Sequence, residues 1–173
     1  MDELFFFSNS ADKKAGKGTN EYVDAEEDYT ELNKIKDWRK ILSNLYCGEF
    51  MYDNKTWNSV EHAFQSKKIE LVDKDQAYLF CKESGHEIGL GNGFIARKNR
   101  KLIILNKKQL ITWNKIKHKI MYDILLEKFT QVPIAKQVLL LTRDAKLMHG
   151  ARGISKSEQI ELEAVRNVLV LNK

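Results

Sequence analysis

Apolar residues recur every three to four positions in several stretches of this sequence, which is the spacing of an amphipathic helix. The clearest case begins at Thr112, a predicted N-cap, and runs to Phe129. Its apolar positions are Trp113, Ile116, Ile120, Met121, Ile124 and Leu125. Further helices are predicted over residues 75–84, over residues 133–141, where Pro133 suits the first turn, and from Ser157 onward. The pattern therefore predicts a chain that is mostly helical.

Short apolar runs between these helices predict strands at residues 3–8, 49–52, 101–105 and 145–148. Asp53 and Asn54 follow the second run as a turn, and the glycine-rich segment 85–93 is expected to be irregular. The predicted fold class is α+β, a mostly helical single domain with a small β-sheet. Residues 1–35 would form a strand plus a polar loop extension, and residues 36–173 the helical core.

One more helix, beginning near Trp57 with Asn58 or Ser59 as N-cap, has an unusual face. Helical spacing puts Glu61, Phe64, Gln65 and Lys68 on one stripe. Burying such polar groups without partners costs about 1–3 kcal/mol each, and more for a charge, so a polar ligand is one candidate to offset it. The alternative is local. With Asn58 as N-cap, Glu61 is the third helical residue, where a glutamate commonly closes a capping box.

Charge is distributed unevenly along the 173 residues, which carry a net charge of +5. Nine Lys and Arg and no acid fall between Ile88 and Tyr122. An acidic cluster near the N-terminus comprises Asp24, Glu26, Glu27, Asp28 and Glu31. The basic stretch indicates either a polyanionic partner, such as nucleic acid or a phosphorylated nucleotide, or simply a solvated basic helix.

Several classes of protein are disfavoured. No apolar run is long enough to span a membrane. Cys47 and Cys81 lie in no metal or redox spacing, which is typical of free thiols in a reducing cytosol. The four histidines lack paired ligand spacing, so no metal site and no cofactor are predicted. Gly16-Lys17-Gly18 could bring N–H groups to a phosphate but lacks the Walker spacing, and a flexible loop is the alternative.

Five segments together resemble the NADAR family, also called YbiA-like, in order and over nearly the whole chain. The segments are Phe6-Phe7-Ser8, Leu42-Ser43-Asn44-Leu45, Trp57-x-Ser59-x-Glu61-His62-x-Phe64-Gln65-x-x-Lys68, the helix from Trp113 through Met121 to Lys128-Phe129-Thr130-Gln131, and Leu139 to Leu147. The longer front end, with Gly16-Lys17-Gly18 and Asp37-Trp38-Arg39, is similar to viral members.

The resemblance implies cleavage of an N-glycosidic bond, and it implies roles for three candidate catalytic residues. Glu61 would be the carboxylate that stabilises the cationic anomeric carbon, or the general base. Lys68 would attack the anomeric carbon of a ring-opened ribose as a neutral amine, which requires burial. Its alternative is a lysine whose stem covers apolar surface. Asp144 would position a ribose hydroxyl or a water, or be an ordinary turn residue.

The same resemblance suggests seven substrate-binding residues. Asn44 and Gln65 suit hydrogen bonds to ribose or phosphate, with local backbone bonding as the alternative. Trp57 and Trp113 could stack on a base, although their apolar stripes favour the core. Lys17 and Arg39 are candidate pyrophosphate contacts. His149 stands where the family commonly has a glutamate, and it or Asp144 could protonate the departing amine.

Between known family substrates, we expect ADP-ribosylated guanine in DNA. The basic stretch suits a phosphate polymer, and Gly150 to Gly153 replace the Asp-x-x-Trp-Gly element of riboflavin-type members. The alternatives are cleavage of phosphoribosyl-pyrimidine intermediates of riboflavin synthesis, and a non-catalytic module that binds ADP-ribose or nucleic acid. The expected setting is cytoplasmic, as an antitoxin or phage-defence factor against a DNA-modifying toxin.

Overall fold

The computed structural model describes residues 1–6, 10–24, 27–150 and 155–172. Helices dominate, and the strands form one three-stranded and one two-stranded sheet, so the predicted mostly helical α+β class is confirmed. The chain divides into two compact units, Met1–Ser43 with Pro133–Lys173, and Asn44–Val132. We call them the terminal unit and the central unit and describe each by itself. The predicted division at residue 35 concerns the polar front end and stays a prediction.

The terminal unit is built on the three-stranded sheet, which joins a strand from the start of the chain to two strands from its last third. Strand β1 (Glu3–Phe5) lies parallel to β4 (Lys146–His149), with Leu4 opposite Leu147. Strand β5 (Ser157–Glu158) pairs antiparallel with β4. Leu4 and Leu147 are both fully buried, which explains why two short apolar runs far apart in sequence pair here. The strands predicted at the chain start and near residue 146 are therefore confirmed, the first one shorter than expected.

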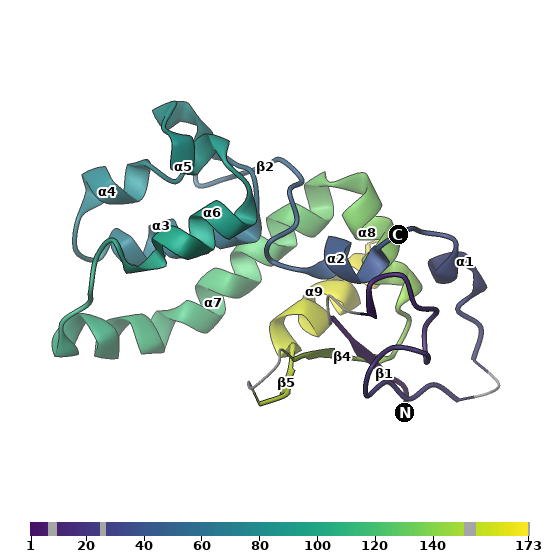
Figure 1. Ribbon diagram of the computed structural model, residues 1–173. Coiled ribbons are helices and arrows are strands. Elements are labelled where there is room, and N and C mark those ends of the chain that lie inside the picture. The colour runs from purple at the N-terminus through teal and green to yellow at the C-terminus, as the bar shows by residue number, and fades with distance from the viewer. Residues whose placement is uncertain (7–9, 25–26, 151–154, 173) are drawn as a thin grey trace. The chain divides into compact units, whose positions relative to one another are not determined.

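Four helices complete the terminal unit: α1 (Thr30–Asn33), α2 (Trp38–Leu42), α8 (Pro133–Leu141) and α9 (Ile160–Leu171). Helix α8 packs on α2 and α9 (Figure 1) and has the predicted bounds. The last helix begins at Ile160 rather than Ser157, because Ser157 pairs with β4 instead. Tertiary pairing here overrides the local helical pattern.

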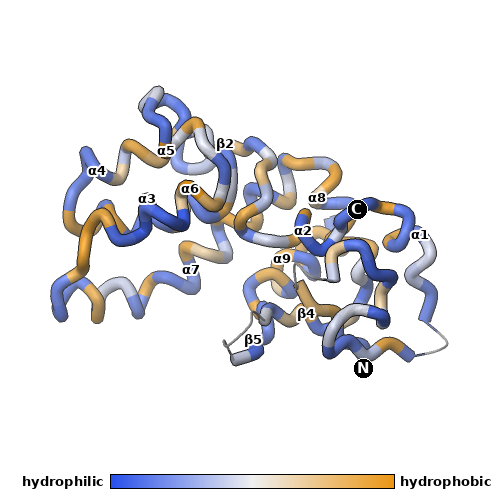
Figure 2. Tube along the Cα trace, viewed as in Figure 1, coloured by the Kyte–Doolittle hydropathy of each residue, from blue (hydrophilic) through white to orange (hydrophobic). Residues whose placement is uncertain are grey.

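The central unit surrounds α3 (Val60–Ile69) with α4 (Lys74–Tyr78), α6 (Gly93–Lys98) and α7 (Lys107–Gln131), as Figure 1 shows. Although α3 is central, Figure 2 shows its trace as largely hydrophilic. Strands β2 (Phe50–Tyr52) and β3 (Lys55–Trp57) form a hairpin beside α7. Short helices η2 (Lys82–Ser84), α5 (Glu87–Leu90) and η3 (Asn99–Lys101) fill the remaining connections.

The hairpin confirms the predicted strand near residue 50 and its turn. Asp53 and Asn54 both have positive φ, 52° and 56°, as the two central residues of a tight two-residue hairpin require. The return strand β3 was not predicted, since Lys55 to Trp57 is too short to show alternation.

Three predictions in the central unit are wrong. No strand forms at residues 101–105, where Leu102 and Ile104 are exposed instead of buried. The helix predicted over 75–84 ends at Tyr78, whose side chain is exposed, and η2 follows separately. The segment 85–93 is not irregular, because α5 forms within it.

The start of the long helix is also wrong. It begins five residues before Thr112, at Lys107, because Asn106 and Gln109 form a capping box with two hydrogen bonds of 2.9 Å. Thr112 lies inside α7 and its hydroxyl donates to the Lys108 carbonyl. The first turns carry exposed apolar residues, so hydrophobic spacing could not locate them.

Some sequence predictions lie outside the described residues. These are Phe7 and Ser8 of the first predicted strand, Glu26 of the acidic cluster, and residues 151–153 of the predicted turn.

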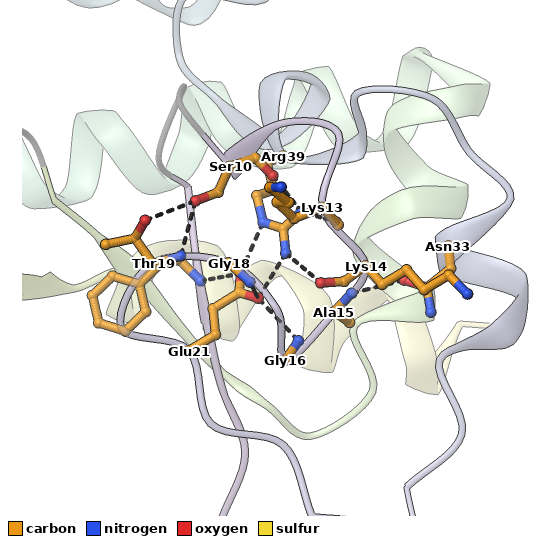
Figure 3. A network of polar contacts seen from close by, with 11 residues as sticks. Ser10, Lys13, Lys14, Ala15, Gly16, Gly18, Thr19, Glu21, Asn33 and Arg39 are labelled. Atoms are coloured by element: carbon orange, nitrogen blue, oxygen red, sulfur yellow. Dashed lines mark hydrogen bonds and ion pairs between the residues drawn. The ribbon is translucent and has the colours of Figure 1, made fainter.

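A buried ion pair holds the polar front end of the terminal unit in place (Figure 3). Arg39 donates to both carboxylate oxygens of Glu21, at 2.8 and 2.6 Å, and the two side chains are 1% and 0% exposed. The Glu21 carboxylate also accepts the N–H groups of Phe5, Gly16 and Gly18 at 3.1, 2.9 and 3.0 Å. A Cβ at Gly18 would lie 2.6 Å from the Glu21 carboxyl carbon, so a side chain there does not fit. We call this arrangement the Glu21–Arg39 clamp.

We expect Arg39→Met to lower the free energy of unfolding by about 3–5 kcal/mol, because it leaves the Glu21 carboxylate buried without its cation. Urea denaturation measures the change. The matched control is Lys40→Met, which removes the neighbouring exposed Lys40–Asp37 pair and should cost less than about 1 kcal/mol. Equal losses in the two variants would contradict the clamp.

Candidate functional site

The N-terminus of α3 is fixed by Ser59, not by Asn58. The Ser59 hydroxyl accepts the His62 N–H and contacts His62 Nδ1 at 2.7 Å. His62 Nε2 reaches the Ile88 carbonyl at 2.9 Å, so Nε2 carries the proton and the ring ties α3 to α5. The Asn58 amide donates instead to the carbonyls of Gly89 and Gly91. Glu61 is thus the second helical residue, and the capping-box alternative for it is wrong.

Glu61 pairs with the residue one turn along the same face. Gln65 Nε2 donates to Glu61 Oε1 at 2.9 Å. Gln65 is buried, Glu61 is half-buried, and Gln65 Oε1 has no hydrogen-bond partner among the described residues. A buried amide oxygen without a donor is costly, so this face keeps one acceptor ready for a donating group.

The environment of Glu61 changes its proton affinity. Burial raises the pKa of this carboxyl above its ordinary value. The hydrogen bond from Gln65 opposes that effect, as do the positive charges of Arg97, Arg100 and Lys68, and the net pKa shift is upward. A carboxyl placed in this way exchanges a proton nearer to neutral pH than a solvated glutamate, as a general acid or base must.

Lys68 shares the face but not the burial expected of a neutral amine. Its side chain is half-exposed, and it makes no hydrogen bond or salt bridge to the part of the chain that is described. Two helical turns, about 10 Å along the axis, separate it from Glu61. Its charge nevertheless acts on the Glu61 carboxyl. The predicted common face is therefore present, and the predicted burial of Lys68 is not.

The two tryptophans proposed for base stacking lie in the core, the role that their apolar stripes favour. Trp57 is 1% exposed and its Nε1 donates to the Tyr52 carbonyl at 2.8 Å. Trp113 is 5% exposed and packs its ring 5.0 Å from that of Phe64. Their contribution is to hold α3 against β3 and α7.

Asn44 contributes to the site through its backbone. Its carbonyl accepts the Glu61 N–H at 3.0 Å, which satisfies one of the free donors of the first turn of α3. Its side-chain amide lies 3.9 Å from the Met121 sulfur. The local bonding alternative thus describes the Asn44 carbonyl, and a substrate contact by its amide stays a prediction.

Four predicted site residues belong to the terminal unit. The Arg39 guanidinium is occupied by the Glu21–Arg39 clamp and by the carbonyls of Ser10, Lys13 and Lys14, so a pyrophosphate contact would require these bonds to break. Lys17 is exposed in the same loop, whose N–H groups hold the Glu21 carboxylate. Asp144 is exposed in the turn after α8, and His149 ends β4. Substrate roles for Lys17, Asp144 and His149 stay predictions.

Arg97 and Arg100 were not predicted as individual site residues. Both belong to the basic stretch, and nothing in their local sequence relates them to Glu61. The packing of α6 on α3 creates the relation. No local sequence pattern could have indicated that these arginines act on Glu61, because their relation to it depends on tertiary packing.

The protein-family comparison matches the NADAR domain over residues 6–153. The chain belongs to the NADAR family. Members of this family are N-glycosidases, so the predicted enzyme class is supported at that level. Among solved structures, the NMR structure of the Escherichia coli protein YbiA matches with a TM-score of 0.63 and 18% identity, covering 99% of this chain and 88% of that one. The likeness shows that the two share a fold. No curated protein matches the chain significantly.

Three further observations limit what this NADAR domain contains. Among the described residues, no group of three or more His, Cys, Asp and Glu side chains could hold a metal ion. No helix in the same ranges is long and apolar enough to cross a membrane. Cys47 and Cys81 are both free thiols, as predicted.

Lys128, in the Lys-Phe-x-Gln segment of the NADAR resemblance, is a titratable group that the site prediction did not include. It is fully buried near the end of α7, with its Nζ 4.7 and 5.4 Å from the ring centres of Phe129 and Tyr46. Burial lowers the pKa of this amine to about 7. Lys128 therefore loses its charge in the folded protein near neutral pH.

We expect the free energy of unfolding to rise with pH between about 7 and 10, because the unfolded chain keeps the Lys128 proton up to an ordinary lysine pKa of about 10.4. The unfolded state then binds more protons than the folded state, so raising the pH favours folding. Lys128→Met should remove this rise. Urea denaturation across the pH range measures it, with Lys115→Met, an exposed lysine of the same helix, as control. A rise that persists in Lys128→Met would assign it to other groups.

Proposed function

We propose that this protein is an N-glycosidase that removes ADP-ribose from guanine bases in DNA. The observation that carries the proposal is the Glu61 carboxyl, which is half-buried on α3, has a raised pKa and is acted on by the charges of Arg97, Arg100 and Lys68. A glycosidase needs a carboxylate beside the anomeric carbon, which becomes positively charged in the transition state. Glu61 is our candidate for that group.

In the proposed reaction, water adds to the anomeric carbon of the ribose while the bond from that carbon to the exocyclic amine of guanine breaks. Glu61 takes one proton from the water as general base. The departing amine gains one proton, so the products are ADP-ribose and unmodified guanine. Because burial raises the pKa of Glu61, its acid form persists to a higher pH than that of a solvated glutamate and can return the proton to the amine.

Gln65 and Lys68 would bind and orient the substrate. The free Gln65 Oε1 suits a ribose hydroxyl as donor, while Gln65 Nε2 keeps Glu61 in place. The half-exposed Lys68 ammonium suits a phosphate or sugar oxygen about two turns further along the helix.

The surface charge of the central unit favours DNA over a small metabolite. All nine basic residues between Ile88 and Tyr122 are exposed or half-exposed. Within the described ranges, Lys119 alone among them lies within 4.0 Å of a carboxylate, that of Asp123. Free cations at this density attract a polymer of phosphates more than a single phosphoribosyl group. The proposed setting is cytoplasmic tolerance of a DNA-modifying toxin.

We expect Glu61→Gln to lower kcat by about 10²- to 10⁴-fold on a guanine-ADP-ribosylated oligonucleotide, since it removes the acid–base group. In the wild type, activity should fall as the pH drops through the Glu61 pKa, at a pH above that of an ordinary glutamate. Release of ADP-ribose, followed by chromatography from about pH 4 to pH 8, measures both effects.

The matched control is Glu70→Gln, which changes a glutamate that immediately follows α3 and pairs with Lys67. It should retain wild-type turnover. Binding of the oligonucleotide without turnover by the wild type would instead identify a non-catalytic reader. Turnover of a phosphoribosyl-aminopyrimidine alone would favour the riboflavin-type alternative.

A separate prediction concerns Lys68. Because its side chain is half-exposed, we expect borohydride to trap no covalent adduct during turnover, and Lys68→Ala to raise KM more than it lowers kcat. Mass spectrometry of the protein quenched with borohydride tests this. An adduct on Lys68 that is absent from Lys68→Ala would instead establish a Schiff-base intermediate.

A further inference from the structure

Helix α6 presents an exposed aromatic residue beside two arginines. Gly93 and Ala96 are its buried residues, and a Cβ at Gly93 would lie 2.4 Å from the Leu45 carbonyl oxygen. This close approach anchors the helix by its small residues. The outward residues are thereby left to solvent, and Phe94 is 68% exposed.

Phe94 is the most exposed aromatic residue of the described chain. The three tryptophans of the protein are all buried, and the other strongly exposed rings are tyrosines, which carry a polar hydroxyl. Arg97 stands three residues after Phe94, on the same side of the helix. A ring and a guanidinium are therefore neighbours on this surface.

The arginines connect this surface to the candidate site. The charges of Arg97 and Arg100 both act on the Glu61 carboxyl. The Arg100 side chain turns back toward α6, because its Nη1 donates a hydrogen bond of 2.9 Å to the Arg97 carbonyl. Neither arginine has a carboxylate within 4.0 Å in the part of the chain that the structure covers. Their guanidinium groups thus remain available to bind phosphate.

We propose that the outward side of α6 and η3, formed by Phe94, Arg97 and Arg100, binds a single strand of DNA next to the reactive nucleotide. Phe94 stacks on a neighbouring base, and the two arginines contact the flanking phosphates. An exposed ring beside unpaired cations is the combination that single-stranded nucleic acid recognises, since every base offers a face and every nucleotide a charge. The absence of acids from Ile88 to Tyr122 supplies the charge complementarity.

Part of this inference rests on the proposed function, namely the position of the strand relative to Glu61. The binding surface itself does not. A binding measurement with unmodified DNA and an activity measurement with modified DNA therefore separate the two.

The first test is fluorescence anisotropy with an unmodified single-stranded oligonucleotide. Phe94→Ala should weaken binding about tenfold, and Phe94→Leu should not restore it, because stacking needs a ring. Arg97→Ala should also weaken binding and lower the salt dependence by about one phosphate contact. The matched controls on α4 are Tyr78→Ala, an exposed ring, and Lys74→Ala, an exposed cation. Both should bind as the wild type does.

The second test compares turnover of an ADP-ribosylated oligonucleotide with that of the ADP-ribosylated mononucleoside. The ratio of the two kcat/KM values should fall about tenfold in Phe94→Ala. Absence of all turnover would refute the proposed function while the binding result stands.

Equal DNA affinity in Phe94→Ala and Tyr78→Ala would overturn the proposed surface. So would a Phe94-dependent association with acidic lipid vesicles in place of DNA.

Discussion

The candidate site in the central unit depends on a balance between the burial of the Glu61 carboxyl and the charges around it, which have opposite effects on its pKa. Burial of Glu61 alone would favour its neutral form, and three positive charges together with the Gln65 amide oppose that effect. The contributions of Gln65 and Lys68 come from α3 itself, whereas those of Arg97 and Arg100 come from residues that follow in the chain and are brought near by tertiary packing. The packing of α6 on α3 is therefore part of the site, together with the glutamate.

That packing in turn depends on small residues and backbone contacts. Gly93 lets α6 approach the backbone of Leu45, and the neighbouring Asn44 carbonyl accepts the Glu61 N–H. His62 and Asn58 tie the same end of α3 to the α5 segment through the carbonyls of Ile88, Gly89 and Gly91. The N-terminal end of α3 is thus held in place by backbone carbonyl groups of the neighbouring segments.

Sequence periodicity predicted the elements whose apolar residues are buried and failed where they are not. Helix α8 has its predicted bounds because Ala135, Val138 and Leu139 are all buried at helical spacing. The strand predicted at residues 101–105 failed because Leu102 and Ile104 are exposed. The site followed the same rule. Glu61 and Gln65 share a face because helical spacing alone requires it, whereas the charge of Arg97 acts on Glu61 through tertiary packing that no local pattern encodes.

The Gly16-Lys17-Gly18 loop binds an anion, as its sequence suggests, but that anion belongs to the protein itself. Its N–H groups do hold an anion, as two glycines around a lysine suggest, but the anion is the carboxylate of Glu21. Because that carboxylate also binds Arg39, the loop and the guanidinium satisfy each other through one side chain. The Arg39 guanidinium is therefore occupied, whereas the basic stretch in the central unit presents exposed cations to a phosphate polymer, and burial of small residues leaves Arg97 and Phe94 at the surface.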